Sequence, residues 1–72
     1  MDVLISFPNT LSVLQAEQIL IRHRIPFETV PRSRFDRELC GLGILFSDVY
    51  FDAARQALDA AQLQAEFTYL EK

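Results

Sequence analysis

The chain has little of several residue types on which small proteins often rely. It contains one cysteine and one histidine in 72 residues, which excludes an internal disulfide and leaves too few ligands for an ordinary four-ligand zinc site. No apolar run approaches the roughly 20 residues that cross a bilayer, and no signal peptide is visible. We therefore expect a cytoplasmic protein without a metal, a cofactor or a membrane segment.

Hydrophobic residues are abundant. They make up 50% of the chain and include six phenylalanines and two tyrosines, which is enough apolar surface to form a core and to disfavour disorder. A chain of this length is close to the smallest that a hydrophobic core alone can stabilise. With no repeat or linker in the sequence, we expect a single domain over residues 1–72.

The charge is unevenly distributed, although the net charge is only −3. Residues 22–37 contain five arginines and two acidic residues, whereas the rest of the chain is acidic. A basic segment on an acidic chain is typical of an anion-binding surface, and it also suits a solvated loop without function. Nucleic acid is an unfavourable partner because the chain as a whole is acidic.

The hydrophobic pattern predicts six elements, with prolines and polar residues between them. Asn9 or Thr10 can cap the first helix, and Ser47 or Asp48 the second. The first helix is expected to turn Val13, Leu14, Glu17, Leu20, Ile21 and Arg24 to one side, and the second Tyr50, Ala54, Ala57, Leu58 and Ala61. The expected elements are strand 2–7, helix 11–23, strand 27–30, strand 42–46, helix 49–62 and strand 66–70.

This order of elements predicts an α+β, ferredoxin-like fold. It is a split β-α-β arrangement of four antiparallel strands with both helices on one face. The first and third strands should be central, and the proline after the second strand favours an edge position for it. Leu4, Leu45 and Leu70 could form an apolar patch on the opposite face, through which two chains could form a homodimer.

We further expect the first and third strands to run parallel to each other. That direction would bring the end of the first helix, with Arg22, His23 and Arg24, to the sheet edge that holds Cys40. The partial negative charge at that helix end would then oppose the arginines there.

Cys40, followed at once by Gly41, is the feature of the sequence that best suggests chemistry. Neighbouring arginines favour a thiolate, so the pKa of the Cys40 thiol should lie below that of a free cysteine. The Cys-Gly pair is nevertheless a weak motif, and free cysteines are commonly buried as small hydrophobic residues. The residues alone leave both interpretations open.

A family resemblance favours the first interpretation. The segments Ser6-Phe7-Pro8-Asn9-Thr10, Ile25-Pro26-Phe27, Val30-Pro31 and Cys40-Gly41-Leu42 resemble a family of very small bacterial proteins described as selenium or sulfur carrier-like. The resemblance covers nearly the whole chain.

The resemblance implies that Cys40 is a carrier thiol that holds sulfur as a persulfide, or selenium in the equivalent form. Gly41 would let a partner approach, and Arg34, Arg37 and His23 would be binding residues around the anion. The implied partners are a cysteine desulfurase-like donor protein and an acceptor protein.

The alternative is a function of another class. Small domains of this architecture also serve as ligand-sensing or protein-docking regulatory modules. In that case the arginine-rich segment would bind an anion or an acidic partner, and Cys40 would be structural. Neither interpretation makes the protein an enzyme in the ordinary sense.

Overall fold

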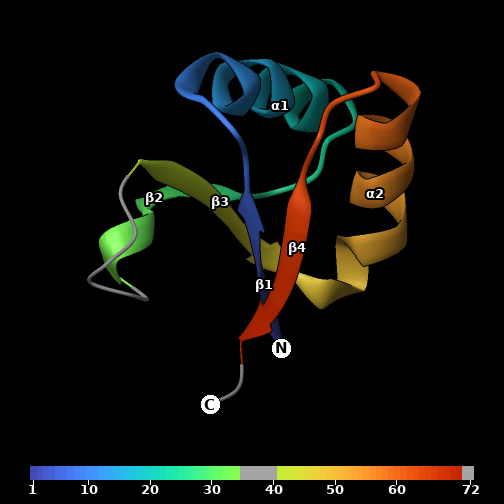
Figure 1. The fold of residues 1–72 in the computed structure, drawn as a ribbon. Helices are drawn as coiled ribbons and strands as arrows, with labels where there is room; N and C mark the ends of the chain where they lie inside the picture. The colour runs from blue at the N-terminus through green and yellow to red at the C-terminus, as the bar shows by residue number, and fades with distance from the viewer. Residues whose placement is uncertain (35–40, 71–72) are drawn as a thin grey trace.

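The structure, a computed structural model, describes residues 1–34 and 41–70 (Figure 1). The predicted order of strands and helices is confirmed, and two short 3-10 helices (η1 and η2) are added to it. The elements are β1 (Asp2–Ser6), α1 (Thr10–Arg22), β2 (Glu28–Pro31), η1 (Arg32–Arg34), β3 (Leu42–Ser47), η2 (Asp48–Tyr50), α2 (Phe51–Ala60) and β4 (Glu66–Leu70).

The four strands form one antiparallel sheet in the order β2-β3-β1-β4. This order confirms the α+β, split β-α-β prediction, with β1 and β3 in the centre and β2 at an edge. The prediction that the first and third strands run parallel is wrong: Val3 pairs with Phe46 and Ser6 with Gly43, in antiparallel register. The physical reason is that the α1 crossover makes β1 and β2 run in the same direction, and the turn after β2 then reverses β3 relative to both.

The direction of β3 separates two groups of residues that the sequence analysis placed together. The chain from α1 enters β2 at Glu28, opposite Leu45, and leaves it at Pro31, opposite Leu42. Figure 1 accordingly shows α1 beginning on the side where β3 begins and ending on the far side. The expected approach of Arg22, His23 and Arg24 to the start of β3 is therefore wrong.

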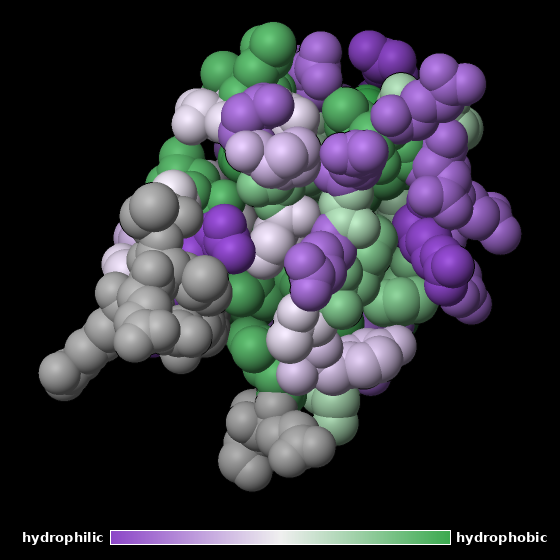
Figure 2. All heavy atoms as spheres, in the orientation of Figure 1, coloured by the Kyte–Doolittle hydropathy of each residue, from purple (hydrophilic) through white to green (hydrophobic). Residues whose placement is uncertain are grey.

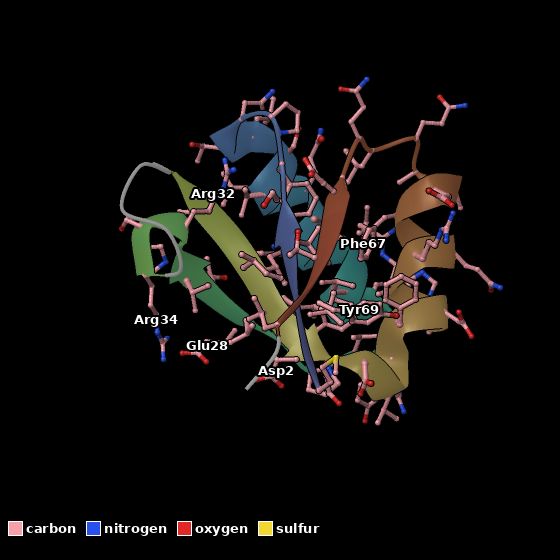
Figure 3. All side chains as sticks on the ribbon, turned by 60° about the horizontal axis from the view of Figure 1, so that its bottom comes forward. Asp2, Glu28, Arg32, Arg34, Phe67 and Tyr69 are labelled. Atoms are coloured by element: carbon pink, nitrogen blue, oxygen red, sulfur yellow. The ribbon has the colours of Figure 1, made fainter. Side chains whose placement is uncertain are left out.

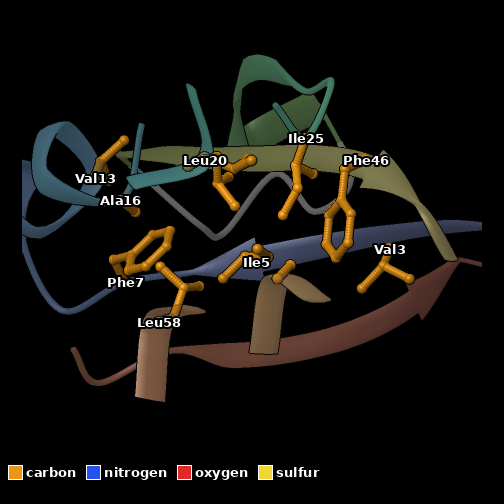
Figure 4. Close-up of a cluster of buried hydrophobic side chains, with 11 residues drawn as sticks. Val3, Ile5, Phe7, Val13, Ala16, Leu20, Ile25, Phe46 and Leu58 are labelled. Atoms are coloured by element: carbon orange, nitrogen blue, oxygen red, sulfur yellow. The ribbon is translucent and has the colours of Figure 1, made fainter. Parts of the chain in front are cut away.

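Both helices cover the same face of the sheet. Val3 and Ile5 of β1 and Ile44 and Phe46 of β3 meet residues from both helices in one buried cluster (Figure 4). The members from the helices are Val13, Ala16 and Leu20 of α1 and Ala54 and Leu58 of α2. Truncation of such fully buried aliphatic residues is usually costly because it leaves a cavity.

The buried side of α1 differs in part from the predicted one. Leu14 and Ile21 are 52% and 60% exposed, whereas Ala16 is fully buried. Figure 2 accordingly shows hydrophobic as well as hydrophilic residues at the surface over α1. Glu17 lies at the edge of the packed side, as expected, and accepts a hydrogen bond of 2.6 Å from the Thr29 hydroxyl of β2.

The second helix follows its prediction more closely. Ala54, Ala57 and Leu58 are buried, while Ala61, just beyond the end of α2, is exposed. Small alanine side chains let a helix lie close to the sheet, as expected from the sequence. Among the residues that the structure describes, no helix is long and apolar enough to span a membrane.

The sheet face opposite the helices is not bare at the end where β3 begins. Leu4 is only 4% exposed and Val30 only 1%. A Cβ atom on Gly43 would lie 3.0 Å from Leu4 Cδ1 and 3.4 Å from Arg32 Cγ, so the Arg32 side chain passes over this part of the face. Leu45 and Leu70 of the predicted patch are half-buried, and a homodimer through this face stays a prediction.

Candidate functional site

The start of β3 is the part of the fold to which the predicted carrier cysteine is attached. The last pair of the β2–β3 ladder joins Pro31 to Leu42, and the Arg32 N–H donates a 3.0 Å hydrogen bond to the Gly41 carbonyl oxygen. These interactions bring the two ends of the connection over residues 32–41 together. Cys40 and Arg37 of the predicted site lie in this connection and outside the described residues.

Gly41 has a backbone conformation that explains its residue type. Its φ is +91°, which L-residues with a side chain rarely adopt, and a Cβ atom there would meet no atom of the described residues within 4 Å, its chain neighbours aside. The residue is exposed. An alanine at this position would therefore be strained by its backbone conformation, whatever the space around it.

Arg34 is the last residue of η1, which directly follows β2. Its Nη1 atom is 3.9 Å from Glu28 Oε1, and both side chains are more than half exposed. An exposed pair at this distance contributes little to stability. The Arg34 side chain thus reaches back toward Glu28, which lies opposite Leu45, and not toward the start of β3 at Leu42 (Figure 3).

His23 lies elsewhere. It is the residue that ends α1, it is exposed, and its backbone N–H bonds to the Ile19 carbonyl. Because α1 leads into the other end of β2, the structure does not bring His23 to Gly41.

The beginning of α1 lies at the end of the sheet where β3 starts. β1 ends at Ser6, which pairs with Gly43, and α1 follows after Asn9, whose Oδ1 accepts a 2.8 Å hydrogen bond from Ser12 N–H. The first turn of α1 contains no acidic residue. A helix N-terminus carries partial positive charge, so the helix dipole at this end of the sheet favours anions. The expectation from the sequence was the opposite end of α1 here, with its partial negative charge.

Arg32 is the most informative side chain at this end of the sheet. Its Nε atom is buried and finds no hydrogen-bond partner among the residues that the structure describes. Figure 3 shows the Arg32 and Arg34 side chains leaving η1 in different directions. Arg32 lines a cavity of about 310 Å³ together with Ser6, Phe7, Pro8, Gln64, Ala65 and Glu66.

Sequence reasoning did not single out this cavity. Arg32 was one of five arginines in the basic segment, and Glu66 is far from it in the chain. Two signals were nevertheless available: the glycine at position 43 within an apolar strand, and the Phe-Pro turn after β1. Both prove to adjoin the Arg32 side chain or its cavity.

Comparison with known proteins identifies the family. A family model described as "Putative Se/S carrier protein-like" matches residues 2–70. The chain belongs to this family. The match covers every strand and helix of this Se/S carrier-like protein. Searches of curated proteins and of solved structures found no match.

Proposed function

We propose that this Se/S carrier-like protein carries sulfur or selenium on the side chain of Cys40. The observation that carries the proposal is the family match over residues 2–70, in a chain whose single cysteine is Cys40. A carrier of this kind needs a nucleophilic atom, and a cysteine thiolate is the group best suited to accept sulfur or selenium.

The transfer step follows the chemistry of thiol–disulfide exchange. The Cys40 thiolate attacks the terminal sulfur of a persulfide on a donor protein, and the sulfur–sulfur bond of the donor breaks. Cys40 then holds the transferred sulfur as a persulfide, and the donor leaves as a thiolate that keeps the electron pair of the broken bond. The same exchange with an acceptor thiol unloads the carrier as an acceptor persulfide, and Cys40 returns to its thiolate.

The surroundings of Gly41 support this chemistry. Gly41, directly after Cys40 in the chain, is exposed and has a positive φ. Arg32 of η1, which lies over Gly43, and the N-terminal end of α1 provide positive charge at the end of the sheet where β3 begins, which stabilises an anionic thiolate or persulfide. In this proposal Arg37 binds the anion and Gly41 admits the partner, whereas His23 takes no part.

Intact-mass spectrometry tests the proposal. The protein is incubated with a cysteine desulfurase and cysteine, and the expected product is a species heavier by about 32 Da, one sulfur atom, that a reductant removes. The Cys40→Ser variant should not gain this mass. The proposal is wrong if the wild-type protein gains no mass, or if Cys40→Ser gains the same mass as the wild type.

A further inference from the structure

The cavity beside Arg32 is lined by two side chains of opposite charge. Arg32 reaches it from η1, and Glu66 reaches it from the first position of β4, opposite Ser6 of β1. The ion pairs found among the described residues do not join the two. The cavity therefore has a positive and a negative group that do not neutralise each other directly.

Gly43 determines where the Arg32 side chain lies. The absence of a side chain on Gly43 makes room for the aliphatic part of Arg32, whose Cγ lies 3.4 Å from where a Cβ of residue 43 would be. The buried Nε has no partner among the described residues, and buried donors without partners are rare in folded proteins because they are destabilising. A carboxylate suits a guanidinium best, since it accepts two parallel hydrogen bonds from it.

A simple anion does not account for Glu66. Its exposed carboxylate would repel an anion bound in the same cavity, whereas it would attract an ammonium group. The amide of Gln64 adds a donor and an acceptor to the lining, and Phe7, Pro8 and Ala65 add apolar surface. The volume is at the small end of the roughly 300–1,000 Å³ found for ligand pockets.

We propose that this cavity binds a small α-amino acid as a zwitterion. Its carboxylate would pair with the Arg32 guanidinium, its ammonium group with the Glu66 carboxylate, and its side chain would lie against the apolar lining. The assignment goes beyond the carrier function, because it gives this protein a small-molecule site built from described residues of β1, η1 and β4 and the chain beside them.

Titration of the Cys40→Ser variant, followed by amide chemical shifts, tests the site independently of sulfur transfer. L-alanine and L-cysteine should cause saturable shifts at Ser6, Phe7, Ala65 and Glu66. Propionate, which lacks the ammonium group, and ethylamine, which lacks the carboxylate, should each bind at least about tenfold more weakly, a difference of about 1.4 kcal/mol. The proposal is overturned if neither amino acid causes saturable shifts there, or if propionate binds as tightly as L-alanine.

Two substitutions and two matched controls test the roles of the charges. Arg32→Met keeps the aliphatic part over Gly43 and removes the guanidinium, and Glu66→Gln removes the exposed negative charge. Each should weaken L-alanine binding at least about tenfold, while Arg55→Gln and Glu28→Gln should leave it unchanged. Circular dichroism shows whether each variant is folded.

Because Glu66 is exposed, Glu66→Gln should fold in any case. Unaltered L-alanine binding by folded Glu66→Gln would overturn the zwitterion assignment. Loss of sulfur loading on Cys40 in the wild-type protein would not affect this result, so the failures of the two proposals are distinguishable.

Discussion

The two glycines of this chain are required for different physical reasons. Gly41 has a φ of +91°, so its backbone conformation selects glycine. Gly43 has no such φ, but a Cβ atom there would lie 3.0 Å from the Ile5 carbonyl oxygen. Its residue type is therefore selected by close packing against β1 and by the Arg32 side chain above it.

Replacing each glycine by alanine separates these reasons. Gly41→Ala should lower the free energy of unfolding by about 1–2 kcal/mol through backbone strain alone. Gly43→Ala should lower it by about 1–3 kcal/mol because the strand must move, and it should also displace Arg32. Urea denaturation measures both effects. An unchanged stability of Gly41→Ala would contradict the positive-φ explanation.

At the scale of single elements, the helices show how packing selects among several apolar residues. α1 presents Leu11, Leu14 and Ile21 to solvent although they are large and hydrophobic. It buries Val13, Ala16 and Leu20 instead, at the spacing of three and four residues that one helix side requires. The fully buried Ala16 allows α1 to lie near the sheet.

A matched pair of truncations tests these assignments. Ile44 is fully buried in β3, and Ile44→Ala should lower the free energy of unfolding by about 2–5 kcal/mol, as for other buried aliphatic residues. Leu14 is 52% exposed, and Leu14→Ala should change it by no more than about 0.5 kcal/mol. Thermal or urea unfolding measures both. Similar losses in the two variants would contradict the burial assigned to β3 or to α1.

At the scale of the whole molecule, the direction of β3 determines which charges can act together. The antiparallel pairing of β1 with β3 places the start of β3 beside the end of β1 and the beginning of α1. The end of α1, with Arg22 and His23, leads instead into the other end of β2. Among the described residues, the positive charge at this end comes from Arg32 of η1 and the N-terminal end of α1.

This topology predicts that His23 has no role in sulfur transfer. His23→Ala should gain the persulfide mass at the wild-type rate in the cysteine desulfurase assay, because the substitution is made at an exposed position away from Gly41. Time-resolved intact-mass measurements give the rate. A clear decrease in the loading rate of a folded His23→Ala protein would show that the donor also contacts the end of α1.

Most of the local structure could be predicted from the sequence. Hydrophobic alternation indicated the strands, and helical spacing indicated the helices. Asn9 or Thr10 was predicted to cap the first helix, and Asn9 does so. The order of elements then led to the strand order, because right-handed crossovers allow few alternatives. The family resemblance on the Phe-Pro, Ile-Pro-Phe and Cys-Gly segments agrees with the family match over residues 2–70. The roles of Cys40 and Arg37 stay predictions, since both residues lie outside the described part of the chain.

Only the tertiary structure decided how these elements face one another. The antiparallel direction of β3 was implied by the predicted antiparallel sheet, whereas the passage of Arg32 over Gly43 is contained in no local pattern. The choice of Ala16 over Leu14 for the core likewise depends on how α1 is rotated above the sheet. Arg32 and Glu66 line one cavity because β4 pairs with β1 at Ser6 while the Arg32 side chain crosses Gly43. Each of these results joins residues that are far apart in the chain, and packing alone brings them together.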